Sequence, residues 1–350
     1  MKYYLKEEFL HDNNDKNAGN KARNDVEEIV KREGYQPLIL SVDDWYQMNF
    51  LKAQCHKAKA FAQVLSQMNK GDLLLIQFPM LHHSFFTTGL VKKAQKRGIK
   101  VYLLIHDLEV LRHANSTSLP LKYRIRIHLQ EGSLLKAADG IIAHNPIMKS
   151  VLADKGIADD KIVSLGIFDY LIPDFQEKSG QTKDQPIIVA GNLAQEKAGY
   201  LYKLPAEPSY NLYGVGFDEN RALLNETYFG SFLPDELPSV LEGGFGLVWD
   251  GDSADTCSGV FGEYLRFNNS HKASLYLAAG FPLVVWKQSA LSHFVLENGC
   301  GIAVESLHDL KVTIDNLSDT DYQDLLENTK RVGKGIRDGH YLLTALNNLK

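Results

Sequence analysis

Apolar runs of strand length alternate with longer amphipathic stretches along nearly the whole chain of 350 residues. This alternation is typical of parallel sheets whose two faces are covered by helices. A chain of this length exceeds the usual size of one hydrophobic core, so we expect two domains. The sequence therefore predicts an α/β protein built from two doubly wound halves.

The expected strands are short apolar runs bounded by polar or glycine-containing turns. They are 37–41, 72–77, 100–105, 140–143 and 161–165 in the first half, and 187–190, 210–213, 246–249, 283–286 and 301–304 in the second. The expected helices are amphipathic stretches at 21–32, 54–68, 88–97, 123–136, 147–155, 197–203, 236–242, 271–279, 290–297, 307–317, 322–332 and 341–349.

A polar stretch at 173–185 interrupts this pattern and has the composition of a linker. We therefore expect an N-terminal domain at 1–172 and a C-terminal domain at 186–335. A terminal helical segment at 336–350 completes the chain.

The composition excludes several classes of protein. With 44% hydrophobic and 23% charged residues, the chain is an ordinary globular sequence. No apolar run approaches the roughly 18 residues that span a bilayer, and the N-terminus lacks the apolar core of a signal peptide. A sequence pI near 6.2 lacks the basic footprint of a nucleic-acid-binding protein. The three cysteines show no metal-ligand spacing, which fits a reducing compartment. We expect a cytoplasmic protein that does not bind nucleic acid.

One basic stripe suggests a surface contact. Lys122, Arg124, Arg126 and His128 alternate with apolar residues, a pattern that suits the anionic inner face of a membrane or a lipid-linked acceptor. A solvated helix face explains the same pattern equally well. Peripheral membrane contact is therefore one of two interpretations.

The segment Asn268-Asn269-Ser270-His271-Lys272 opens the expected helix at 271–279. Free N–H groups in a first helical turn and the helix dipole favour an anion, and Lys272 adds a positive charge. The alternative is an ordinary N-capped helix, because Asn and Ser are common caps. On the first interpretation this segment holds a diphosphate.

Two further turns follow expected strands of the second half. In open α/β sheets ligands bind beyond the carboxyl ends of the strands. Gly191-Asn192 can bring backbone N–H groups close to an anion, with Lys197 supplying charge. Tyr213-Gly214 follows the next strand, where we expect a nucleobase or ribose.

These residues resemble the donor-binding elements of bacterial GT-B glycosyltransferases, in particular the β-1,6-galactofuranosyltransferase-like and adhesin-glycosylating glucosyltransferase group. The resemblance extends loosely over nearly the whole chain. One departure is Leu275, which stands where many relatives have a glutamate that contacts the donor's ribose or sugar. The positions that carry the resemblance are Gly191-Asn192-Leu193 with Lys197, Trp249-Asp250-Gly251, Asn268-Asn269 with His271-Lys272, and Trp286 with Ser289-Ala290.

The resemblance implies two Rossmann-like domains that face each other across a cleft, with the last helix crossing back to the first domain. It implies a nucleotide-sugar donor, UDP-linked, held by the second domain, and a lipid-linked or protein-linked glycan acceptor held by the first. It also places the loop containing Gly19 and Asn20 beside the cleft, where it touches donor or acceptor. Capping of the first helix by Asn20 is the structural alternative.

Glycosyl transfer builds negative charge on the leaving diphosphate, which Lys197 and Lys272 would stabilise. An inverting enzyme also needs a base near the acceptor hydroxyl. Asp107 is our first candidate, with His106 beside it, because both follow an expected strand of the first domain. Weaker candidates at similar positions are His82, His83, Glu109, Arg112 and His144.

Asp250-Gly251-Asp252 follows another strand, and Asp250 is placed to contact sugar hydroxyls. An Asp-x-Asp pair also suits a divalent ion that bridges a diphosphate. Two cationic helix starts already neutralise the diphosphate, so we expect no metal and no other cofactor.

We therefore expect a hexosyltransferase that moves galactofuranose or glucose from a UDP-sugar to a glycan acceptor in cell-surface polysaccharide or glycoprotein synthesis. It can act as a homo-oligomer. The alternative is a catalytically silent GT-B partner or scaffold of another transferase, which Leu275 keeps open. A nicotinamide-dependent oxidoreductase is disfavoured because Gly214 and Gly216 form only part of a dinucleotide fingerprint.

Overall fold

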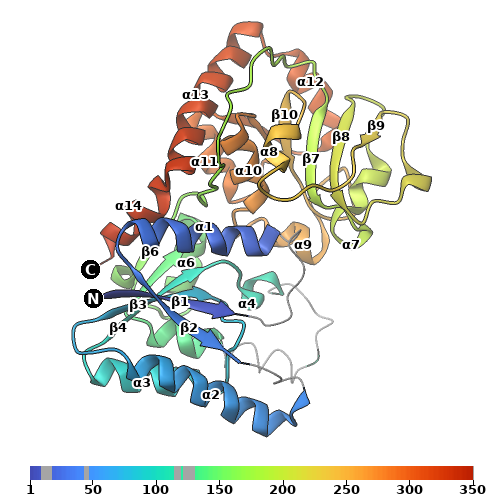
Figure 1. The fold of residues 1–350 in the computed structure, drawn as a ribbon. Coiled ribbons are helices and arrows are strands. Elements are labelled where there is room, and N and C mark those ends of the chain that lie inside the picture. The colour runs from blue at the N-terminus through green and yellow to red at the C-terminus, as the bar shows by residue number, and fades with distance from the viewer. Residues whose placement is uncertain (9–17, 43–46, 114–119, 121–130, 350) are drawn as a thin grey trace. The chain divides into compact units, whose positions relative to one another are not determined.

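The computed structural model describes the chain except residues 9–17, 43–46, 114–119, 121–130 and 350. Within these limits the chain forms two compact units (Figure 1). The first comprises Met1–Asn14, Arg23–Leu165 and Leu342–Lys350, and the second comprises Asp15–Ala22 and Gly166–Tyr341. Each unit is built around its own six-stranded sheet.

The first sheet has the strand order β2-β1-β3-β4-β5-β6, and all neighbouring strands are parallel. Helices α2 and α3 lie side by side on one face, and α1 lies on the other (Figure 1). The strands are β1 (Lys2–Glu8), β2 (Gln36–Ser41), β3 (Leu73–Phe78), β4 (Lys100–Ile105), β5 (Gly140–Ala143) and β6 (Ile162–Ser164). The helices are α1 (Ala18–Arg32), α2 (Phe50–Ser66), α3 (Thr87–Lys96), α4 (Glu109–Arg112), α6 (Pro146–Asp154) and α14 (His340–Asn348).

The second sheet has the order β12-β11-β10-β7-β8-β9, again with parallel neighbours. Counted from its own first strand, this is the strand order of a Rossmann fold. The strands are β7 (Ile187–Asn192), β8 (Tyr210–Val215), β9 (Glu226–Tyr228), β10 (Phe245–Val248), β11 (Leu283–Trp286) and β12 (Gly301–Val304). The helices are α7 (Gln195–Ala198), α8 (Leu237–Val240), α9 (Gly259–Tyr264), α10 (His271–Ala279), α11 (Leu291–Asn298), α12 (Leu310–Asp315) and α13 (Asp319–Asp338).

Two hydrophobic layers cover the second sheet, because successive side chains of a strand point to opposite faces. In β7, Ile187 and Val189 join one layer, while Ile188 and Ala190 join the other. The second layer also contains most of α10, whose side chains from Ala273 to Ala279 are all buried. Burial on this scale fixes the start of α10 relative to the strand ends.

The prediction of an α/β protein with two doubly wound sheets is confirmed. Strands β4, β5, β11 and β12 and helix α10 have the bounds expected from the sequence. Strands β1 and β9 and helices α4 and α9 were not expected. The first part of the helix expected at 123–136 and the basic stripe Lys122 to His128 lie outside the described residues. In the part of the chain that the structure describes, no helix is both long and apolar enough to cross a membrane.

Candidate functional site

The second sheet changes direction between β7 and β10, since β8 and β9 follow on one side and β11 and β12 on the other. Ligands of open α/β sheets bind beyond the strand ends at such a switch point. Strand β7 ends in Gly191-Asn192, and Trp249-Asp250 directly follow β10. These are positions that the sequence predicts for a donor site.

Lys272 links the start of α10 to this switch point. Its Nζ donates to Asp250 Oδ1 at 2.8 Å and to the Trp249 backbone oxygen at 3.2 Å. A Cβ added at Gly191 would lie 3.6 Å from Lys272 Cδ, so the lysine stem passes beside the end of β7. An ammonium group has three donors, and these contacts use two of them. Lys272 is therefore placed to donate to an anion bound at this edge.

Glycine is required where β7 and β8 end. Gly191 has a φ of 125° and Gly214 a φ of 150°. A Cβ at Gly214 would lie 1.8 Å from the Gly191 backbone oxygen, so no side chain fits there. The two strand ends therefore approach each other through bare backbone, with no room for a side chain between them.

Asn269 and His271, at the start of α10, contact another segment of the second unit. Asn269 is 2% exposed and donates through Nδ2 to the Gly166 backbone oxygen at 2.5 Å. The His271 ring packs against the rings of Phe168 and Tyr170, with centroids 5.7 and 5.4 Å away. These two residues of the predicted diphosphate motif hold α10 to the segment 166–170, and Lys272 is the one that reaches the switch point.

Asn268 and Ser270 complete this motif. Ser270 is the N-cap residue by its backbone conformation, but its side chain makes no capping hydrogen bond. Within the described parts of the chain, the buried Oδ1 of Asn268 has no hydrogen-bond partner. An amide oxygen accepts hydrogen bonds, so it suits a ligand hydroxyl rather than a phosphate.

The remaining donor-site candidates lie around the same strand ends. Asn192 is exposed and accepts a hydrogen bond from the Ala194 backbone N–H at 2.9 Å. The Gly251 N–H donates to the Lys197 backbone oxygen at 2.8 Å. The Nζ atom of Lys197 lies 5.5 Å from the centroid of the Phe261 ring. Lys197 thus ties the turn after β7 to the turn after β10.

Tyr213 lies in the core rather than at the surface. Its side chain is 1% exposed, stacks on the Phe229 ring at 4.9 Å and accepts a hydrogen bond from the Glu242 backbone N–H. A ligand contact at this position would therefore use the backbone of Tyr213.

The two carboxylates of Asp250-Gly251-Asp252 have separate partners. Asp250 pairs with Lys272, whereas Asp252 accepts a hydrogen bond from Ser258 Oγ at 2.5 Å, which lowers the pKa of Asp252. Among the described residues, no group of three or more His, Cys, Asp or Glu side chains is placed to hold a metal ion.

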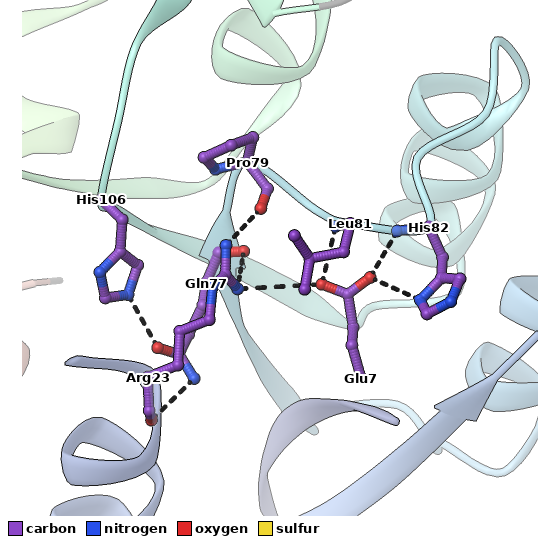
Figure 2. Close-up of polar contacts among 7 residues, drawn as sticks. All are labelled: Glu7, Arg23, Gln77, Pro79, Leu81, His82 and His106. Carbon is purple, nitrogen blue, oxygen red and sulfur yellow. Dashed lines mark hydrogen bonds and ion pairs between the residues drawn. The ribbon is translucent and has the colours of Figure 1, made fainter. Parts of the chain in front are cut away.

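A second polar cluster lies at the carboxyl ends of β1, β3 and β4 in the first unit (Figure 2). The first sheet changes direction between β1 and β3. The buried Glu7 carboxylate accepts from the backbone N–H groups of Leu81 and His82 at 3.0 and 2.7 Å, and lies 3.1 Å from His82 Nδ1. Arg23 donates to the backbone oxygens of Gln77 and Pro79 at 3.3 and 2.6 Å. Our sequence analysis missed Glu7, Arg23 and Gln77.

The two catalytic candidates follow β4 directly. His106 Nε2 lies 2.8 Å from Gln77 Oε1, and Asp107 forms a 2.7 Å ion pair with Arg112. Arg112 also pairs with Glu109 at 2.5 Å. Both candidates thus belong to polar clusters at this strand end.

Burial shifts the pKa of three further groups in the first unit. It lowers the pKa of His83, together with the nearby Lys57 charge, to about 4, and it lowers the pKa of His144 to about 4. Both histidines are therefore neutral at pH 7. Burial raises the pKa of Glu131 to about 7 although its carboxylate accepts two backbone N–H groups near α4.

Gly19 and Asn20 lie in the first turn of α1, which begins at Ala18. Asn20 is therefore inside the helix and is not its N-cap, so the capping interpretation is wrong. The neighbouring Lys21 donates to the Leu171 backbone oxygen at 2.7 Å and pairs with Asp235 at 2.8 Å.

Comparison with known proteins identifies the class. Solved structures with this fold include sucrose-phosphate synthase from Thermosynechococcus elongatus, with a TM-score of 0.66 and 12% identity over 99% of this chain and 97% of that one. Another is Anabaena HepE in complex with UDP, with a TM-score of 0.54 and 11% identity over all of both chains. The fold is that of GT-B glycosyltransferases.

Sequence comparison narrows the class to one family. The models for the N-terminal and C-terminal domains of glucosyltransferase 3-like proteins match residues 2–167 and 187–349. The β-1,6-galactofuranosyltransferase WbbI of Escherichia coli is 33% identical over 347 residues, which are 97% of this chain and 96% of that protein. The chain belongs to the glucosyltransferase 3-like family of glycosyltransferases.

Proposed function

We propose that this protein transfers galactofuranose from UDP-galactofuranose to a glycan acceptor in the synthesis of a cell-surface polysaccharide or glycoprotein. The observation that carries the proposal is the 33% identity to a β-1,6-galactofuranosyltransferase across almost the full length of both chains. A match of this extent includes both units, and hence the strand ends of both sheets.

We further propose that the donor diphosphate binds at the switch point between β7 and β10. Lys272 supports this assignment because its ammonium group is held at that edge with one donor left for a ligand. The HepE structure supports UDP as the nucleotide by analogy of fold. The residues proposed for the donor nucleotide site as a whole are Gly191, Asn192, Lys197, Tyr213, Gly214, Asn268, Asn269, Ser270, His271 and Lys272.

The acceptor, a lipid-linked or protein-linked glycan, is proposed to bind at the first unit, with Asp107 and His106 as the catalytic residues. Asp107 as base would take the proton of the acceptor hydroxyl. Gly19, Asn20 and Asp250 are proposed to contact the donor sugar or the acceptor. The domain limits given above, a cytoplasmic location at the inner face of the membrane, and a homo-oligomer stay predictions.

A donor screen tests the proposal. Purified protein is incubated with a glycan acceptor and either UDP-galactofuranose, UDP-galactopyranose or UDP-glucose, with and without EDTA, and the released UDP and the extended acceptor are measured. We expect turnover with UDP-galactofuranose that persists in EDTA. If UDP-glucose is the one donor of the three that supports turnover, the proposed sugar is wrong. If EDTA abolishes turnover, the expectation that no metal is needed is wrong.

A silent partner of another transferase is the second candidate. Leu275, which stands where many relatives carry a donor-contacting glutamate, is buried in the core layer of α10. UDP binding without transfer or hydrolysis, across all donors and several acceptors, would favour this candidate.

A further inference from the structure

The cluster in Figure 2 fixes which way the Gln77 amide faces. Gln77 is 4% exposed, and its side-chain nitrogen lies 3.2 Å from the Arg23 backbone oxygen. A backbone carbonyl can only accept, so the NH₂ group of Gln77 must be the end that faces Arg23. The Oε1 atom then faces His106 Nε2 at 2.8 Å.

An amide oxygen also can only accept, so His106 Nε2 must carry the hydrogen. We propose that Gln77 is a positioning residue that sets the tautomer of His106, with the proton on Nε2 and the basic lone pair on Nδ1. The opposite tautomer would place two lone pairs 2.8 Å apart at a part-buried contact, where they would repel each other. In a neutral imidazole only one ring nitrogen carries a hydrogen. The hydrogen bond that one nitrogen makes therefore decides whether the other is protonated.

Arg23 and Gln77 hold each other in this orientation. The Arg23 guanidinium donates to the Gln77 backbone oxygen, and the Gln77 side chain donates to the Arg23 backbone oxygen. Glu7 lies 3.9 Å from the guanidinium and also binds the backbone at Leu81 and His82. The amide cannot turn over without losing the hydrogen bond from its NH₂ group to the Arg23 backbone oxygen.

The consequence for the reaction rests on the proposed function, in which His106 faces the acceptor. There, Nδ1 would be the basic nitrogen of the neutral ring. Other ionisable groups around this strand end are Arg23 on α1, Glu7 on β1, Asp107 and His144, and the last two interact electrostatically. The tautomer itself does not depend on the function.

The direct test is NMR spectroscopy of the full-length protein labelled with ¹⁵N-histidine. Long-range ¹H–¹⁵N spectra distinguish the two tautomers, and the His106→Gln variant assigns the His106 signals. We expect the Nε2–H pattern in the wild type and a mixture of tautomers in Gln77→Met. Gln95→Met is the matched control, because Gln95 also donates to backbone, at Ala137, but lies on α3 away from the cluster. An Nδ1–H pattern in the wild type, or an unchanged pattern in Gln77→Met, would overturn the inference.

The Gln77→Glu variant provides a second test if Gln77→Met does not fold. A carboxylate loses the hydrogen bond to the Arg23 backbone oxygen. It still accepts from Nε2 and adds a negative charge, so the Nε2–H pattern should persist while the pKa of His106 rises by roughly one unit or more. An unchanged pKa in an NMR titration would overturn the inference.

Kinetics separate the inference from the proposed function. We expect Gln77→Met to lower kcat and raise the KM for the acceptor, while the KM for the donor stays unchanged. Wild-type kinetics combined with an altered His106 tautomer would leave the tautomer inference standing. That result would instead remove His106 from the proposed catalytic site.

Discussion

Lys272 and Asp250 form an ion pair with 2.8 Å between Nζ and Oδ1, where their side chains are only 13% and 7% exposed. Removing one partner leaves the other charge nearly buried and alone, which costs about 3–5 kcal/mol in comparable pairs. The pair therefore contributes to stability as well as to the proposed donor site. Any variant of Lys272 has to be tested for both effects.

We predict that Lys272→Ala weakens UDP binding at least about tenfold, because a phosphate loses one charge-assisted hydrogen bond. Isothermal titration calorimetry measures the affinity, and urea unfolding measures the stability. The double variant Lys272→Ala with Asp250→Asn should recover stability but not affinity. Lys287→Ala is the control, since Lys287 pairs with Glu305 at the surface. Equal UDP affinity in Lys272→Ala and the wild type would remove the proposed diphosphate contact.

Gly214→Ala should destabilise the second unit by about 3 kcal/mol or more, because its Cβ would overlap the Gly191 oxygen. Gly230→Ala is the matched control. Gly230 also has a positive φ, of 82°, but a Cβ there meets nothing within 4 Å, so we expect a cost of about 1 kcal/mol. Unfolding midpoints in urea compare the two variants. Equal destabilisation would contradict the close approach of the two strand ends.

The stability of the protein should depend on His83 between pH 6.5 and 4. Its pKa is about 4 in the fold and about 6.5 when unfolded, so the unfolded state binds more protons in this range. Stability is fully present above pH 6.5 and falls as the pH is lowered, by about 1 kcal/mol at pH 5.5.

The contribution of His83 is isolated by comparing how much stability a variant and the wild type lose when the pH is lowered. Glu131, with a pKa of about 7, acts in the opposite direction, because its protonation favours the folded state as the pH falls. We therefore compare His83→Gln with the wild type at pH 7.5 and 5.5 and expect a smaller loss of stability in the variant. His56→Gln, at an exposed position, should match the wild type. Identical losses in all three proteins would contradict the neutral, buried state of His83.

Asp107→Asn should lower kcat by about 10²–10⁴ and leave the KM for the donor unchanged, if Asp107 is the base. The control is Glu109→Gln, because Glu109 shares Arg112 with Asp107. A structural effect through Arg112 would appear in both variants, whereas loss of the base appears only in Asp107→Asn. Initial rates at saturating donor and acceptor decide between them.

The sequence predicted the strands best where apolar residues are continuous. Leu283–Trp286 is fully buried and Gly301–Val304, at the edge of the sheet, is mostly buried, and the bounds of both were predicted correctly. Strand β1 was missed because Lys2-Tyr3-Tyr4-Leu5-Lys6-Glu7-Glu8 contains few apolar residues, although it pairs with strands on both sides. Parallel pairing, rather than its own composition, makes this segment a strand.

Only those residues of the candidate site that follow recognisable strands could be predicted from the sequence. Residues after recognisable strands, such as Asp250 and His106, could be proposed from the sequence. Glu7 and Gln77 could not, because Glu7 lies in the missed strand and Gln77 looks like an ordinary residue of a buried strand. Their partners are distant in sequence, and only the folded sheet brings them together.

The anchoring of Asn269 on Gly166 and of His271 on Phe168 and Tyr170 has a practical consequence for domain-swap experiments. A chimaera joined within the linker-like stretch at 173–185 would pair α10 with a foreign version of its support. Junctions placed before Gly166 keep the helix and its support from the same parent, so such hybrids should retain donor binding where the later junctions lose it.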